Sequence, residues 1–198
     1  MEKLVKFGLY DQLGYLFGGA LAEAVIFLDV LIRDRNVTLP QGTLFTAVFM
    51  VVGAYFLGHF CQAVANLVFR EKPTDFTDKE KKILQRIIKK YDLAKDDYRE
   101  AFAVCMAFTK WKDVTGEVAA FNANYGLYRG WKVVASMNVV YGLGLAILSS
   151  DKTEFRNGLL TAVVSLVVAV ILSIRAKRFY KYTGKKVLLT YQLLEIKD

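Results

Sequence analysis

Residues 53–66 read GAYFLGHFCQAVAN and form the inner half of a long apolar stretch. Polar side chains interrupt this stretch at intervals of four, three and four residues, a spacing that places them on one face of a helix. They are Tyr55, His59, Gln62 and Asn66. A helix that is apolar except for one polar stripe is typical of a membrane span facing the interior of a helix bundle. The sequence therefore predicts a membrane protein organised around this helix.

The chain contains four apolar runs long enough for a hydrocarbon core that needs roughly 20 helical residues. They cover residues 13–32, 43–69, 131–150 and 158–174. Because the first run is long and Glu23 interrupts it, we interpret it as a span and not as a cleaved signal peptide. Charged residues make up 23% of the 198 positions, so they must lie mainly outside these runs. The predicted fold class is an all-α integral membrane protein with four transmembrane helices.

The positive charges predict the topology. Only Arg33 and Arg35 lie between the first two spans, and only Lys152 and Arg156 between the last two. The other 23 of the 27 Lys and Arg residues (27 − 4) lie in the N-terminal segment, the 70–132 region and the C-terminal tail. Loops rich in Lys and Arg stay in the cytosol. We therefore expect a multi-pass protein with both termini and the central insert in the cytosol.

The regions between the spans predict further helices. Thr77 and Glu80 form a capping-box pattern that begins a helix, and a second helix is expected over about 95–112. This cytosolic helical hairpin has too small a core to be stable alone, so it must pack on the spans or on a neighbouring subunit. No strong helix breaker occurs from 116 to 149, which predicts one long helix extending from the cytosol through the third span. Residues 187–194 are apolar enough for a further short helix.

The chain is accordingly divided into four segments: 1–70, with the first two spans; 71–130, the cytosolic helical insert; 131–174, with the third and fourth spans; and 175–198, a basic cytosolic tail.

Glu23 is the carboxylate nearest the middle of the first span, where it must be protonated, paired or hydrated. An ion pair with His59 or Arg129, and a role in ion passage, gating or sensing, are both open. For His59 the alternatives are a hydrogen-bonded packing side chain and a proton-transfer or pore-lining one. The candidates for an intramembrane polar stripe or pore are Glu23, Tyr55, His59, Gln62, Asn66 and Asn138.

A second polar stripe lies just before the third span. Asn122, Tyr125 and Arg129 recur at intervals of three and four residues, and they are candidates for a cytosolic gate or a partner contact. After the fourth span, basic side chains are positioned to meet the anionic lipid headgroups of the cytosolic leaflet. These lipid-headgroup candidates are Arg175, Lys177, Arg178 and Lys181.

Several function classes lack their motifs. There is no HxxxH or CxxC pattern, so we expect no metal site and no cofactor. There is also no GxSxG, Walker A or HExxH motif, which argues against an enzyme. The net charge of +8 has no RNA-binding signature beside it, so a nucleic-acid partner is not expected.

Two blocks of sequence, LGHFCQAVAN at 57–66 and EVAAFNANYGLYRG at 117–130, resemble a group of small bacterial membrane proteins of antiphage defence, of the CRISPR-accessory and abortive-infection type. The resemblance rests on these two blocks, which are 10 and 14 residues long. It implies oligomerisation in the bacterial inner membrane and arrest of the infected cell by permeabilisation. The residues concerned would be His59, Gln62, Asn66, Asn122, Tyr125 and Arg129.

Three functional hypotheses follow. The leading one is a homo-oligomeric inner-membrane protein whose polar seam forms or gates a pore, because four spans are too few to enclose a wide pore alone. The second is a non-conducting scaffold or sensor that presents residues 71–130 to a cytosolic protein partner. The third is a small membrane-embedded enzyme or transporter, which would need a cavity within one subunit converging on Glu23 and His59.

Overall fold

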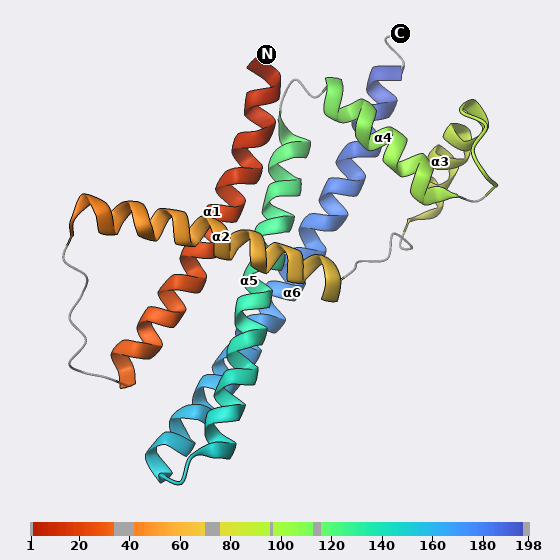
Figure 1. Ribbon diagram of the computed structural model, residues 1–198. Helices are drawn as coiled ribbons and strands as arrows, with labels where there is room; N and C mark the ends of the chain where they lie inside the picture. Colours follow the sequence, from red (N-terminus) through yellow and green to blue (C-terminus); the bar gives the residue numbers. More distant parts are fainter. Residues whose placement is uncertain (1, 34–41, 70–75, 96, 113–115, 196–198) are drawn as a thin grey trace. The chain divides into compact units, whose positions relative to one another are not determined.

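A computed structural model describes residues 2–33, 42–69, 76–95, 97–112 and 116–195 and confirms an all-α protein, with no strand in these ranges. Figure 1 shows the helices along the chain. They are α1 (Glu2–Arg33), α2 (Leu44–Val68), α3 (Asp78–Lys90), α4 (Tyr98–Lys112), α5 (Glu117–Leu148) and α6 (Lys152–Glu195).

Three helices in the described part of the chain are long and apolar enough to cross a membrane: α2, α5 and α6. The sequence predicts four spans, and the run at 13–32 is the one missing from these three. It does form a helix, α1, which is 32 residues long and whose described side chains are those of residues 14–29. Glu23 and Asp29 both lie in this part of α1.

The chain folds into two compact units, and α5 and α6 contribute to both. Unit 1 comprises Met1–Phe69 and Ala123–Lys177, and unit 2 comprises Arg70–Asn122 and Arg178–Asp198. Unit 1 thus holds α1, α2, most of α5 and the N-terminal part of α6. Unit 2 holds α3, α4 and the C-terminal part of α6.

Small residues set the helix packing in unit 1. The helices α1 and α2 meet near their middles, where a Cβ atom at Gly19 would overlap the Ala54 carbonyl oxygen and one at Gly58 that of Tyr15. The C-terminal part of α5 packs closely on the N-terminal part of α6. There, a Cβ atom at Gly142 would lie 2.7 Å from the carbonyl oxygen of Gly158. All three approaches are too close for a side chain, so glycine permits backbone-to-backbone packing of the kind that associates helices in membranes.

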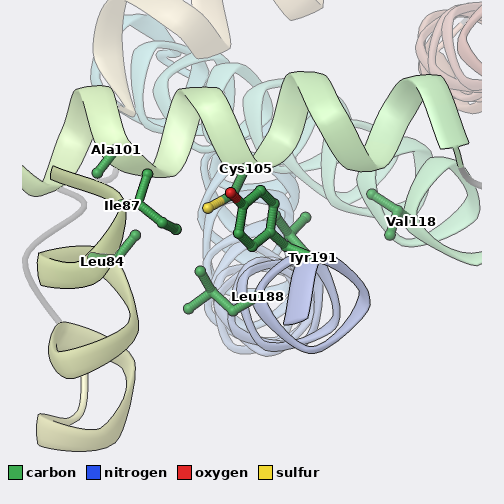
Figure 2. Close-up of a cluster of buried hydrophobic side chains, with 8 residues drawn as sticks. Leu84, Ile87, Ala101, Cys105, Val118, Leu188 and Tyr191 are labelled. Carbon is green, nitrogen blue, oxygen red and sulfur yellow. The ribbon is translucent and has the colours of Figure 1, made fainter. Parts of the chain in front are cut away.

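Unit 2 has a hydrophobic core of its own, shown in Figure 2. The helix α3 begins with the predicted capping box, in which the Glu80 carboxylate accepts a hydrogen bond of 2.7 Å from the Thr77 backbone N–H. Its apolar face, with α4 and the ends of α5 and α6, builds the core. The buried residues are Leu84, Ile87, Ala101, Cys105, Val118, Val187, Leu188 and Tyr191.

The helix α6 corrects one prediction from the sequence. Residues 187–194 do not form a separate short helix, because α6 continues without interruption from Lys152 to Glu195. Gly184 lies inside the helix and costs about 1 kcal/mol relative to alanine. The buried side chains that follow it, Val187, Leu188 and Tyr191, pack into the core of unit 2 and offset that cost. The long helix predicted from residue 116 is confirmed as α5.

Candidate functional site

His59 lies in an aromatic cluster between α1 and α2. Its ring stacks on Tyr15 with ring centroids 4.0 Å apart and meets the edge of the Tyr55 ring at 4.6 Å. The side chain nevertheless remains exposed, as does Asn66 two turns further along α2. Neither residue forms a hydrogen bond within the described part of the chain.

Gln62 connects the two polar stripes that the sequence predicts. A Cβ atom added at Gly126 would lie 3.4 Å from Gln62 Nε2, and one at Gly130 would lie 3.9 Å from its Oε1. The amide therefore packs against a glycine-lined face of α5. The glycines at 126 and 130 form a GxxxG pair in the second sequence block, and this spacing is the signal that sequence reasoning missed.

Arg129 holds the C-terminal end of α2 from its position on α5. Its Nη2 donates hydrogen bonds to the carbonyl oxygens of Ala65, at 2.6 Å, and Phe69, at 3.1 Å. The last carbonyl groups of a helix carry partial negative charge, so a guanidinium is well suited to them. The side chain is 8% exposed and lies over the Tyr125 ring, with Cζ 5.1 Å from its centroid.

The guanidinium of Arg129 also has an unused donor. Its Nε is buried without a hydrogen-bond partner among the described residues. Arg129 therefore pairs with main-chain carbonyl groups and not with Glu23, the ion pair that the sequence left open. Next to it, Lys132 Nζ lies 3.7 Å from the centroid of the Phe69 ring, so a second cation covers the end of α2.

The two carboxylates in the described part of α1, Glu23 and Asp29, have separate environments. Glu23 is partly buried against Gly53 of α2, where its carboxylate occupies the space that a side chain would fill. Asp29 Oδ2 accepts a hydrogen bond of 2.6 Å from the Tyr141 hydroxyl of α5. Neither Gly53 nor Tyr141 is among the residues that the sequence singles out, because both depend on how the helices pack.

The remaining candidates are spread along α5 and α6. Asn122 and Asn138 are partly buried on α5, sixteen residues apart, and do not gather at one site. The basic side chains after the apolar part of α6 are exposed, and Arg178 Nε donates a hydrogen bond of 2.8 Å to the Tyr182 hydroxyl. The exposed set is Arg175, Lys177, Arg178 and Lys181.

Burial disfavours ionisation of two side chains in the core of unit 2, Cys105 and Tyr191. Burial raises the pKa of the Cys105 thiol to about 12, so it stays protonated at neutral pH and is a poor nucleophile. Burial also raises the pKa of Tyr191, with the neighbouring Tyr91 hydroxyl adding to the effect. Among the described residues no group of His, Cys, Asp or Glu has the arrangement of a metal site.

Comparison of the chain with protein-family models, with curated proteins and with solved structures finds no match.

Proposed function

We propose that this chain is a four-span membrane protein that assembles with copies of itself and forms or gates a polar pathway along the exposed stripe of α2. The observation that carries the proposal is the exposure of His59 and Asn66, neither of them hydrogen-bonded to another described residue, on a helix whose other exposed side chains are mostly apolar. In hydrocarbon, such polar groups are costly unless they meet a polar partner or water.

A second copy of the chain is the partner that this surface fits. The exposed face of α2 combines His59 and Asn66 with large apolar residues such as Phe56 and Phe60. Interhelical hydrogen bonds within membranes contribute roughly 0.6–2 kcal/mol each, so an oligomer would gain from burying both polar groups together. Several copies arranged around an axis would place the stripes in a shared hydrated seam, and Glu23 lies against Gly53 of α2.

The biological setting in this proposal is the bacterial inner membrane, with both termini in the cytosol. The distribution of Lys and Arg supports the topology. The resemblance of the blocks at 57–66 and 117–130 to antiphage-defence proteins supports a role as a membrane-permeabilising effector. Under this proposal α1 is the fourth span.

The experiment measures ion flux from liposomes that contain the purified chain, with oligomer mass determined on the same samples. The variants are His59→Ala, Asn66→Leu and Glu23→Gln, with Phe49→Leu as a control at an exposed apolar position of α2. We expect flux from a defined oligomer that the polar substitutions change and the control does not. A stable oligomer that never conducts would overturn the pore function.

The second candidate is a non-conducting scaffold or sensor that presents unit 2 to a cytosolic protein. The observation in its favour is that one member of each stripe already has contacts within the chain: Gln62 packs against the glycine-lined face of α5, and Arg129 donates two hydrogen bonds to the end of α2. In that case the stripe stabilises the bundle. Oligomers without flux, together with a phenotype that depends on unit 2, would favour this candidate.

A further inference from the structure

The helix α3 carries on one face a row of cations that have no partner among the residues described by the structure. We call this row the basic stripe. Its members are spaced by three, four and three positions: Lys79, Lys82, Arg86 and Lys89. All four side chains are exposed, and the opposite face of α3 buries Leu84 and Ile87 in the core of unit 2. The orientation of the stripe is therefore determined by the packing of α3.

The basic stripe does not stabilise unit 2. Like charges three or four residues apart on a helix repel one another and lower its stability. None of the four cations forms a hydrogen bond or an ion pair within the described residues. The same unit does pair cations elsewhere, since Lys90 Nζ lies 2.8 Å from Glu195 Oε1 and Lys186 pairs with Glu117. A row of repelling cations with no acidic partner is typical of a surface that meets an external anion.

We propose that the basic stripe docks α3 on the anionic lipid headgroups of the cytosolic leaflet. The covalent chain favours this partner: α3 begins ten residues after α2 ends, and ten residues span at most about 35 Å. The N-terminus of α3 thus stays within that distance of the inner end of a candidate span. A helix of 13 residues is about 20 Å long and, with its cations in one row, can lie flat on a charged surface.

This inference goes beyond the proposed function, because it holds whether or not the chain conducts ions. It assigns unit 2 a docked position that depends on lipid charge. Each Lys or Arg near an anionic leaflet contributes about 1 kcal/mol, so three of them shift docking on the order of a hundredfold.

The test places a fluorophore on α3 of the full chain at Gln85→Cys, an exposed position beside the stripe. The native thiols of Cys61 and Cys105 are buried and leave the introduced one as the reactive site. The protein is reconstituted into phosphatidylcholine vesicles with or without phosphatidylglycerol, and quenching by headgroup-labelled lipid is measured at low and high salt. Lys79→Gln/Lys82→Gln/Arg86→Gln removes three cations of the stripe, and Lys95→Gln/Arg99→Gln/Lys185→Gln removes three exposed cations elsewhere in unit 2.

We expect quenching only with phosphatidylglycerol, its weakening by salt, and a shift toward the undocked state on the order of a hundredfold in the stripe variant but not in the control. Replacing Lys79 removes a cation from the first turn, where cations are unfavourable, so helical content should be retained. Equal quenching in neutral vesicles, or in the stripe variant, would overturn the proposal. The proposal would also be overturned if the parent chain in neutral vesicles bound an RNA oligonucleotide and the stripe variant did not.

Discussion

Arg129 is a buried cation whose partners are main-chain carbonyl groups. We predict that Arg129→Gln lowers the free energy of unfolding by about 1.5–3 kcal/mol, the usual contribution of hydrogen bonds to a charged group. Arg129→Lys should lower the free energy of unfolding by a smaller amount, since an ammonium group keeps the positive charge at the end of α2. Denaturant titration in detergent micelles measures both. Arg178→Gln, at an exposed position, is the control, and equal stability of the two glutamine variants would contradict the helix-end role.

Cys105 gives unit 2 a dependence on alkaline pH. The thiol has an ordinary pKa near 9, which folding raises to about 12. Above pH 9 the unfolded chain ionises while the folded one does not, so the stabilisation is full below pH 9 and is lost as pH rises to 12. Between pH 9 and pH 12 we expect ionisation of Cys105 to lower the free energy of unfolding of unit 2 by up to about 1.4 kcal/mol per pH unit.

Melting temperatures measured from pH 7 to pH 11 by near-ultraviolet circular dichroism test this expectation. Cys105→Ala removes the ionisable group while leaving the site apolar, so its stability should fall less steeply above pH 9. Identical pH profiles for the variant and the parent chain would refute the assignment to Cys105.

At the residue scale, the sequence indicates which side chains share a face but not what they touch. The spacing of His59 and Gln62 on α2 is readable from the sequence, because helical periodicity alone determines it. That Gln62 meets Gly126, and that Glu23 meets Gly53, depends on how helices far apart in the chain approach each other. Glycines carry no side-chain chemistry, so they are absent from any list of candidate polar residues.

Among the helices, the contact between α1 and α2 is the one most sensitive to added volume. A Cβ atom at Gly58 would overlap the Tyr15 carbonyl oxygen, and both are backbone-fixed, so Gly58→Ala must separate the helices. We predict a loss of about 1–3 kcal/mol or more in the free energy of unfolding. Gly144→Ala is the matched control, because no atom lies within 4 Å of its Cβ position.

The same denaturant titration measures both glycine variants. Gly144→Ala should be neutral or more stable by roughly 0.5–1 kcal/mol, since alanine favours the helix. A Gly58→Ala protein as stable as Gly144→Ala would mean that α1 and α2 do not pack closely.

Helix boundaries could be predicted where a local signal exists. The capping box at Thr77 and the absence of breakers from 116 to 149 correspond to the start of α3 and to the length of α5. The continuity of α6 could not be predicted in this way. Gly184 and the change from apolar to basic residues suggest a break, whereas burial of Leu188 and Tyr191 by α3 and α4 keeps the helix intact. This packing is tertiary and has no local signature.

At the scale of the whole molecule, composition predicts the all-α class, but the division into two units depends on packing between distant segments. Unit 2 joins residues 70–122 to 178–198, and the reason is the apolar face of α6 beyond Gly184. Hydropathy identifies the runs that become α2, α5 and α6. The side of the membrane on which the N-terminus lies depends on whether α1 is the fourth span.

The number of spans can be tested with single cysteines and a membrane-impermeant maleimide in intact cells. If α1 crosses the membrane, Lys3→Cys lies on the same side as Lys95→Cys, and both react only after permeabilisation. Asp151→Cys, in the turn between α5 and α6, should react in intact cells. With three spans, residue 3 would lie outside together with residue 151. Reaction of Lys3→Cys in intact cells, with Lys95→Cys still protected, would therefore reject the fourth span and leave α1 on the outer surface.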